Sequence, residues 1–340
     1  MLTIEELELV CDRSEAVELP KNSIEGPDLL LHATFFPYGF PVQVWTNSEE
    51  VLANYGELWG RFEKQYDTDP VQVHVQAIEG RAGGNSDECP PEPAYRMQSP
   101  LMTAVADRDN YSLIDMERGV VRITVSYAAL RYPLYIQYFI LGTPGCIIST
   151  HHSTPVHAAC VALDGKGILL CGDSGAGKST LSYACARAGW TYVSDDGCFL
   201  HNGGTTRRVT GDCYKVRLRP HAAKFFPELE GMEITPRAAG KPSIELQTEP
   251  MVHISRKPTA TIEHIVFLNR RWQGPPQLVP YRKDVARQFI RQTLFGLQHT
   301  QDRQYEVIER FLNNVDVFEL RYSSLDWAID RLRKLVREGQ

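Results

Sequence analysis

GDSGAGKST, residues 172–180, matches the phosphate-binding pattern G-x-x-x-x-G-K-[ST] at every fixed position. The stretch follows a short apolar run, Ile168–Cys171, that is typical of a buried strand. It leads into a helical pattern over Thr180–Ala188, which Gly189 would end. An accidental match is expected about once in a hundred chains of this length. Because a phosphate-binding loop joins a strand to a helix, these flanks favour an α/β nucleotide-binding domain over an accidental glycine-rich turn.

The residue types of the loop suit the binding of phosphate. Its glycines permit positive φ angles, so that backbone N–H groups can turn inward, and the helix N-terminus adds positive potential. Lys178 would bridge the β- and γ-phosphates of ATP, and the Ser179 hydroxyl would bind Mg²⁺. The candidate nucleotide-binding residues are Gly172, Asp173, Ser174, Gly175, Ala176, Gly177, Lys178, Ser179 and Thr180.

Length and composition describe an ordinary globular protein. The 340 residues, 43% hydrophobic and 23% charged, are enough for two domains. A formal charge of -6 gives no general electrostatic reason to bind nucleic acid or an anionic membrane. The N-terminus is acidic where a secretory signal would be basic, and no apolar stretch approaches the roughly 20 residues that span a bilayer. We expect a cytoplasmic protein with neither nucleic acid nor membrane as a partner.

The eight cysteines follow no metal-binding or redox pattern. They include no C-x-x-C pair, and their positions show no regular spacing of the zinc-ligand type. They are therefore predicted to be reduced thiols in the core, and a structural zinc site is not favoured.

Residues 1–148 are predicted to form a separate domain of mixed α+β structure. The β-rich runs Leu29–Phe36 and Phe40–Trp45 flank a turn and together predict a hairpin. A helix start follows at Asn47–Val51, and Val71–Ile78 alternates apolar and polar residues as a half-buried strand does. Because this domain carries no recognisable catalytic motif, we expect it to recruit the acceptor or to serve assembly.

Residues 149–340 alternate strand and helix patterns, as an α/β domain requires. A predicted hairpin of Val156–Leu163 and Ile168–Cys171 delivers the chain into the glycine loop. The strand after the loop, Trp190–Ser194, ends at the pair Asp195-Asp196. Further strands are predicted over Thr261–Leu268 and Val315–Leu320, and helices over Asp284–Gln298 and Leu325–Val336.

Three polar residues outside the glycine loop are candidates for chemistry. Asp195 and Asp196 follow Lys178 after one helix and one strand, so the chain can return them beside bound phosphates. His157 precedes Gly172 at the start of the hairpin. Without the loop, a solvated Asp-Asp turn would be the favoured interpretation, and His157 is alternatively a packed or capped strand histidine. Beside the loop, two carboxylates and an imidazole can divide the duties of base and metal ligand.

Over residues 155–200 the chain resembles the catalytic domain of HPr kinase/phosphorylase, whose fold is shared in part with phosphoenolpyruvate carboxykinase. The matching residues are His157, the turn Asp164–Gly167, the loop Gly172–Ser179 and the strand end Val193–Asp196. The resemblance implies an α/β phosphate-loop domain of the HPr-kinase/carboxykinase type, preceded here by the mixed α+β N-terminal domain. It also implies a homo-oligomer.

The resemblance further implies roles for the polar residues. Asp195 would accept the proton of the attacking hydroxyl, Asp196 would help to hold Mg²⁺, and His157 would tune the pair. The chain departs from the regulatory kinase in two places: Ser179 is followed by Thr180 instead of Glu, and the downstream Pro-Gly-Arg signature is missing. The acceptor and the reverse reaction are therefore left open.

Phosphoryl transfer also needs a further cation to neutralise charge on the transferred oxygens. Candidates are Arg217 and Arg219 in one segment and Arg237 and Lys241 in another. We rank Arg237 and Lys241 first, because glycine and proline around them suggest a clamp that can move. Each is alternatively an ordinary surface charge.

These patterns together predict an ATP- and Mg²⁺-dependent kinase that acts on a hydroxyl-bearing acceptor, either a serine of a peptide or protein or a small metabolite. One alternative is a carboxykinase-like or pyrophosphate-using phosphotransferase. A second alternative is a nucleotide-gated regulatory module with little turnover. Asp195 disfavours that module, since nucleotide sensing needs no second carboxylate at this position.

Overall fold

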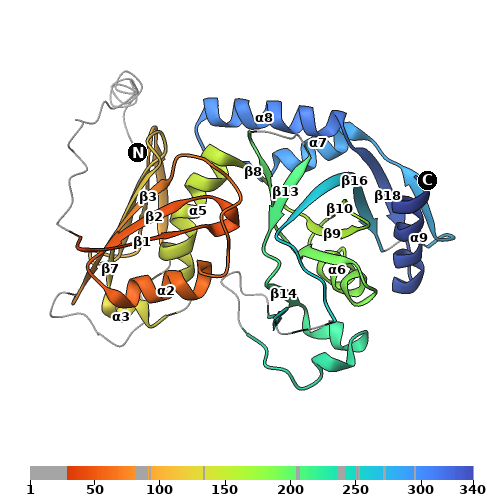
Figure 1. Cartoon of the computed structure of the whole chain (residues 1–340), viewed down its shortest axis with the longest axis horizontal. Coiled ribbons are helices and arrows are strands. Elements are labelled where there is room, and N and C mark those ends of the chain that lie inside the picture. Colours follow the sequence, from red (N-terminus) through yellow and green to blue (C-terminus); the bar gives the residue numbers. More distant parts are fainter. Residues whose placement is uncertain are drawn as a thin grey trace, which may run out of the picture. The chain divides into compact units, whose positions relative to one another are not determined.

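The chain divides into two compact units, Met1–Ile148 and Ser149–Gln340. Each unit combines β-sheet with helices, so the protein is a mixed α/β chain (Figure 1). The computed structural model describes residues 29–80, 91, 93–132, 135–203, 207–235, 242–249, 251, 253–270, 273–294 and 296–339.

The described part of the N-terminal unit contains one seven-stranded sheet. Its strand order is β1-β2-β3-β7-β6-β5-β4. Strands β1 and β2 pair antiparallel, which confirms the predicted hairpin, whereas β2 and β3 are parallel. The strands are β1 (Leu31–Phe35), β2 (Val42–Thr46), β3 (Val71–Ile78), β4 (Ala94–Gln98), β5 (Leu101–Val105), β6 (Tyr111–Asp115) and β7 (Val120–Ser126).

Helix α2 (Glu49–Trp59) packs against β1 and β2. It begins where predicted, because the Ser48 hydroxyl accepts a hydrogen bond of 3.4 Å from a backbone N–H of the first turn. Tyr55 and Trp59 are buried, with ring centroids 5.7 and 6.5 Å from that of Phe35. The other helical segments are η1 (Pro37–Gly39), α3 (Tyr127–Leu130), η2 (Ile136–Gly142), α5 (Thr143–Ile147) and η3 (Ile148–His152).

The described part of the C-terminal unit is built on a nine-stranded sheet. Its order is β11-β9-β10-β16-β13-β12-β8, and β18 joins β16 with β17 next to it. The strands are β8 (Ser153–Val156), β9 (Ala159–Leu163), β10 (Lys166–Cys171), β11 (Thr191–Ser194), β12 (Cys198–His201), β13 (Arg208–Gly211), β16 (Thr259–Asn269), β17 (Gln277–Pro280) and β18 (Asp316–Arg321). A separate two-stranded sheet comprises β14 (Lys215–Leu218) and β15 (Ile244–Gln247). The helical segments are α6 (Lys178–Arg187), η4 (Pro220–Lys224), η5 (Pro227–Leu229), α7 (Lys283–Arg291), α8 (Gln298–Asn313) and α9 (Leu325–Glu338).

Strand β10 has a hydrophobic core on each face, because successive side chains of a strand point to opposite faces. Ile168 and Leu170 are buried in the core that includes α6 and α9. Leu169 and Cys171 are buried in the core that includes α7 and α8. Helices thus cover both faces of the sheet (Figure 1), and this explains why the run before the glycine loop is apolar at every position.

Three neighbouring strands at the centre of this sheet, β10, β16 and β18, run in the same direction. Strand β10 pairs parallel with β16, and β16 pairs parallel with β18. The carboxyl ends of parallel strands lie at one edge of a sheet, which is where ligands commonly bind in α/β folds. The segments that follow Cys171, Asn269 and Arg321 are therefore brought together at the edge from which the glycine loop leaves.

The single helix predicted over Asp284–Gln298 is wrong in its extent. Helix α7 ends at Arg291, and a second helix, α8, begins at Gln298. The Thr293 hydroxyl donates to Ile290 O over 2.8 Å and satisfies a carbonyl at the end of α7. Gly296 then has a φ of 112°, which a helix does not allow. The predicted C-terminal helix is confirmed as α9, and the two predicted strands beside it as β16 and β18.

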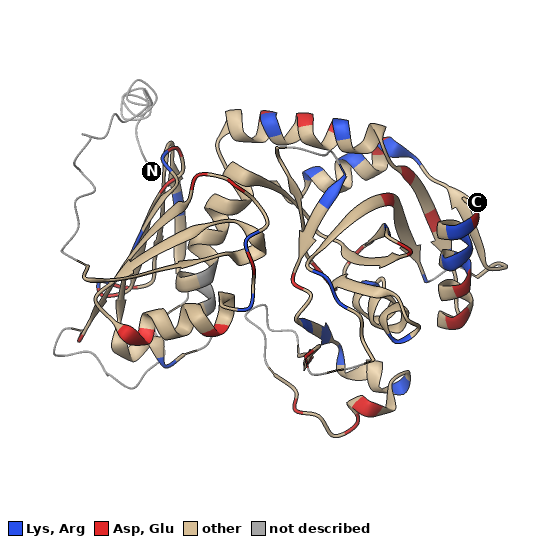
Figure 2. Ribbon diagram, viewed as in Figure 1, with Lys and Arg blue, Asp and Glu red and all other residues tan. Residues whose placement is uncertain are grey.

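Charged residues of both signs lie along the outer helices α8 and α9 (Figure 2). The described helices are all too short or too polar to cross a membrane.

Six of the eight cysteines lie in the described residues, and all six are free thiols. Five of them are buried, as predicted for core thiols. Burial raises the pKa of Cys185 to about 12, so this thiol is protonated at neutral pH. Cys11 and Cys89 lie outside the described residues.

Candidate active site

The glycine loop joins β10 to α6, and its backbone needs glycine at several positions. Gly172, Gly175 and Gly177 have φ angles of 146°, 87° and 103°, which residues with a side chain rarely adopt. A Cβ atom on Gly177 would lie 3.2 Å from Arg270 Cδ and 3.3 Å from the hydroxyl of Tyr322. The loop therefore makes a tight turn, with close neighbours, immediately before the helix begins.

The side chain of Lys178 folds back over the loop. Its Nζ donates to Gly172 O over 2.7 Å and, at 3.5 Å, to Asp173 O. Burial lowers the pKa of Lys178, and the carboxylate of Asp196 opposes this change. A cation held at the N-terminus of a helix is well placed to contact an anion.

The aspartate pair lies in the turn between β11 and β12. The Ser194 hydroxyl donates to Gly197 O over 2.7 Å and closes the turn. The Ser179 hydroxyl, in the first turn of α6, donates to Asp195 O over 3.4 Å. The structure thus brings the aspartate pair next to the N-terminus of the helix into which the glycine loop leads.

Asp195 is a buried carboxylate with an unusual pKa. The side chain accepts a hydrogen bond at Oδ2 from the backbone N–H of Arg217 in β14, over 2.9 Å. Burial raises the pKa of Asp195 to about 6, although the Arg217 N–H opposes the rise, and the neighbouring Asp196 carboxylate adds to it. A carboxylate with this pKa is mostly ionised at neutral pH and is a stronger base than an exposed aspartate.

Asp196 and His157 are more exposed and face each other. Strands β8 and β12 pair antiparallel with Val156 opposite Cys198, so the residues just beyond this pair lie close together. His157 Nδ1 is 3.6 Å from Asp196 Oδ1. Burial lowers the pKa of His157, and Lys178 lowers it further, while Asp196 opposes both. His157 therefore contacts the pair through Asp196 and not through Asp195.

Ser179 and Asp196, the predicted Mg²⁺ ligands, suit an ion that is shared with phosphates. Both carry oxygen donors. Ser179 lies in the first turn of α6, and Asp196, in the turn between β11 and β12, acts electrostatically on Lys178. Mg²⁺ prefers oxygen ligands and is commonly held by one or two carboxylates together with substrate phosphates. Among the described residues, no cluster of three or more His, Cys, Asp or Glu could hold a metal alone. The two oxygen donors therefore fit a magnesium ion whose remaining ligands would include nucleotide phosphates.

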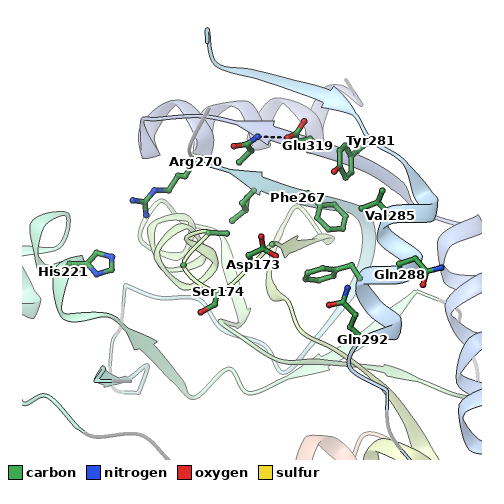
Figure 3. A pocket seen from close by; sticks show the side chains of 16 residues that line it. Asp173, Ser174, His221, Phe267, Arg270, Tyr281, Val285, Gln288, Gln292 and Glu319 are labelled. Atoms are coloured by element: carbon green, nitrogen blue, oxygen red, sulfur yellow. Dashed lines mark hydrogen bonds between the residues drawn. The ribbon is translucent and has the colours of Figure 1, made fainter. Parts of the chain in front are cut away.

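A cavity of about 790 Å³ opens beside the glycine loop. Figure 3 shows Asp173 of the loop near its centre, with Arg270 and His221 to one side and α7 residues to the other. The cavity is lined by loop residues 172–176, by the end of β16 and by α7. Its lining includes neither the aspartate pair nor His157.

Arg270 is a cation that sequence reasoning missed. It directly follows β16, lines the cavity and lies against Gly177. Its side chain is exposed, and it forms no ion pair with any described residue. The sequence did contain a signal for Arg270, since this residue closely follows the predicted strand Thr261–Leu268. Only the parallel pairing of β16 with β10, however, shows that this strand end adjoins the glycine loop.

The four cations predicted from the sequence have other positions. The Arg217 guanidinium is paired with Glu245 over 2.7 Å, and it is the backbone of Arg217 that contacts Asp195. Arg219 donates to Pro242 O over 3.4 Å at an exposed position. Arg237 and Lys241 lie outside the described residues. Of the candidate loop residues, Gly177, Lys178, Ser179 and Thr180 lie outside the cavity lining, and Thr180 is buried within α6.

Comparison with known proteins gives a weak structural likeness. No protein-family model matches the sequence, and no curated protein matches it. Among solved structures, the chain is similar to the "Hpr(Ser) kinase/phosphatase from Coxiella burnetii". Identity is 12%, the match covers 54% of this chain and 99% of that chain, and the TM-score is 0.30. A score this low does not establish a shared fold or activity.

Proposed function

We propose that this protein is an ATP- and Mg²⁺-dependent kinase that transfers a phosphoryl group to the hydroxyl of a peptide, a protein or a small metabolite. The observation that carries the proposal is the position of Asp195: its backbone carbonyl accepts from the Ser179 hydroxyl at the N-terminus of α6, and its buried carboxylate accepts from the Arg217 N–H. A glycine loop alone suits many nucleotide-binding proteins. A buried carboxylate with a raised pKa, on a residue that contacts the helix after that loop, suits a protein that also takes a proton from an acceptor.

In the proposed reaction, the loop and its cations bind the donor. Backbone N–H groups of the loop and the N-terminus of α6 contact the phosphates, and Lys178 and Arg270 balance the charge of the transferred group. Ser179 and Asp196 would hold Mg²⁺, which would neutralise further charge on the phosphates. Each of these groups acts by position and charge, which is how phosphoryl transfer is mainly catalysed.

Asp195 is the proposed general base. The acceptor oxygen bonds to the γ-phosphorus, its O–H bond breaks, and the proton passes to the carboxylate while ADP leaves. The backbone N–H of Arg217 fixes one oxygen of Asp195. His157 is a positioning residue that acts on the site through Asp196. We assign recruitment of the acceptor to the N-terminal unit, and we propose that the chain forms homo-oligomers.

The first prediction tests donor binding through Lys178. The purified chain is incubated with γ-labelled ATP, Mg²⁺ and a panel of peptide, protein and small-molecule hydroxyl acceptors, and the products are identified by mass spectrometry. Lys178→Ala should abolish most of the transfer and weaken the affinity for Mg-ATP, since its ammonium lies at the loop. Lys334→Ala, which changes an exposed lysine on α9, is the matched control and should behave as wild type.

Circular dichroism and thermal melting establish that both variants are folded. Wild-type transfer and wild-type Mg-ATP affinity in a folded Lys178→Ala protein would contradict the assignment of the loop. Binding of Mg-ATP without labelling of any acceptor, and with negligible release of phosphate, would instead identify a nucleotide-gated module.

A further inference from the structure

The cavity beside the glycine loop extends well beyond the loop itself. Its volume of about 790 Å³ falls within the usual range of small-molecule sites, and an inorganic diphosphate would fill only a small part of it. One wall is the loop, where Gly172–Ala176 line the cavity, and another is helix α7. A ligand whose phosphates contact the loop would therefore have room for a second, larger part on the side of α7.

The α7 side of the cavity is aromatic. Phe267 in β16 lies between two other rings: its centroid is 5.3 Å from that of Tyr281 and 5.2 Å from that of Phe289. All three rings line the cavity and are only partly buried. Figure 3 shows Phe267 and Tyr281 beside the cavity. Aromatic surface of this kind favours a flat ring, because stacking adds to the burial of apolar area.

Helix α7 presents an uncharged face to the cavity. Val285, Gln288, Phe289 and Gln292 line it at positions i, i+3, i+4 and i+7, which share one side of a helix. The two glutamine side chains are exposed, and each amide can both donate and accept hydrogen bonds. This side can therefore pair with the mixed donor and acceptor edge of a heterocycle.

Two carboxylates line the cavity, Asp173 in the loop and Glu319 near the aromatic rings, and Glu319 is already compensated. Glu319 Oε1 accepts from Asn269 over 2.8 Å, and Glu319 Oε2 accepts from Arg321 Nε over 2.8 Å. The cavity is thus polarised: the loop and Arg270 form a side for anions, and α7 with the three rings forms a nearly neutral side. A molecule that joins an anionic chain to a neutral heteroaromatic ring matches both sides.

We infer that the aromatic side of this cavity is the base subsite, so that the phosphoryl donor is a nucleoside triphosphate and not pyrophosphate. This inference rests on the proposed function, because it takes the phosphates to be held at the glycine loop. Phe267, Tyr281 and Phe289 contact the face or edge of the base. Gln288 and Gln292 pair with its polar edge.

Two probes separate the base from the phosphates: Mg-ATP and inorganic tripolyphosphate with Mg²⁺. Calorimetry with the full-length chain should give much tighter binding of Mg-ATP. Phe289→Ala should weaken Mg-ATP binding about 5- to 150-fold, the range expected for one base stacked on an aromatic side chain. It should leave tripolyphosphate binding unchanged, because that probe does not reach α7. Gln288→Ala should give a smaller loss for Mg-ATP alone.

Gln298→Ala is the matched control, since Gln298 is an exposed glutamine on α8 that is not part of the cavity lining. It should bind both probes as wild type does. If Phe289→Ala does not fold, Phe289→Leu and Gln292→Ala test the same contacts with less disturbance. Melting temperatures identify the folded variants.

Three outcomes would overturn the base subsite. In the first, Gln288→Ala and a folded Phe289→Ala or Phe289→Leu all bind Mg-ATP as tightly as wild type. In the second, the variants lose as much affinity for tripolyphosphate as for Mg-ATP. In the third, the wild-type chain binds ATP and tripolyphosphate equally well. Each of these leaves the kinase proposal standing. Failure of the wild-type chain to bind either probe, by contrast, would refute the kinase proposal itself.

Discussion

At the scale of single residues, Asp195 combines two opposing requirements. Its burial raises the pKa of the carboxyl to about 6 and makes it a better proton acceptor than an exposed aspartate. The same burial makes the ionised form costly in the folded state. The pKa of Asp195 is higher in the folded state than in the unfolded state. This cost is therefore absent at low pH, where the carboxyl is protonated in both states, and it is present in full above pH 6. The residue therefore favours chemistry at the expense of stability.

The pKa of Asp195 predicts how the rate depends on pH. Since the base must be ionised, the single-turnover rate should fall about tenfold per pH unit below 6 and level off above it. Asp195→Asn should remove this dependence and lower the rate by roughly 10²- to 10⁴-fold, with Mg-ATP affinity nearly intact. Asp196→Asn should instead weaken Mg²⁺-dependent nucleotide binding. Quenched-flow transfer and calorimetry measure the two effects.

The two aspartate variants are matched controls for each other, because both replace one carboxylate by an amide in the same turn. A loss of Mg-ATP affinity in Asp195→Asn, with the rate at saturation retained, would show that the two roles are reversed. A rate that stays constant from pH 5 to pH 8 in the wild-type chain would show that Asp195 is not the base.

At the scale of elements, the start of α6 depends on one glycine. Gly177 has a φ of 103° and close neighbours in Arg270 and Tyr322. Gly189, just after α6, has a φ of 88°, but a Cβ atom added there would meet no atom within 4 Å. Both positions therefore share the strain of a positive φ, but only Gly177 also has close neighbours. Left-handed backbone costs a residue with a side chain roughly 1–2 kcal/mol.

Gly177→Ala and Gly189→Ala should consequently have similar free energies of unfolding but different affinities for Mg-ATP. Both should lower the free energy of unfolding by about 1–2 kcal/mol, measured by denaturant titration. Only Gly177→Ala should weaken Mg-ATP binding, because its new methyl group displaces Arg270 and widens the loop. Equal Mg-ATP affinity in both variants would show that the neighbours of Gly177 yield without disturbing the loop.

Sequence reasoning succeeded where local pattern determines structure. The run before the glycine loop predicts β10, and the helical pattern after it predicts α6. It failed at the end of α7, where a threonine and a glycine stop a helix whose apolar pattern continues. It also missed Arg270, because the contact between β16 and β10 depends on pairing between distant segments and leaves no local pattern.

At the scale of the whole molecule, the C-terminal unit has cores of its own. All the buried residues of the two cores around β10 belong to residues 149–340, as do all residues that line the cavity. The catalytic candidates Asp195, Asp196 and His157 belong to this unit as well. The residues that would bind the nucleotide therefore all belong to the C-terminal unit.

A chain of residues 149–340 should accordingly fold alone and bind Mg-ATP with an affinity close to that of the full chain. Transfer to the natural acceptor should fall, since the N-terminal unit is proposed to recruit it. Calorimetry and thermal melting test the first expectation, and labelling of the acceptor tests the second. A folded fragment without Mg-ATP affinity would show that residues 1–148 contribute to the nucleotide site.

The pairing of β10 also has a consequence for biosynthesis. One edge of β10 is covered early by β9, but the other edge is covered by β16, in which Phe267 lies opposite Cys171. A ribosome needs about 5–20 s to add the intervening residues. During that interval the nascent chain exposes an apolar strand edge, which is a target for aggregation and for chaperones. The proposed nucleotide site is complete only after Glu319, the last residue of the cavity lining, has left the ribosome.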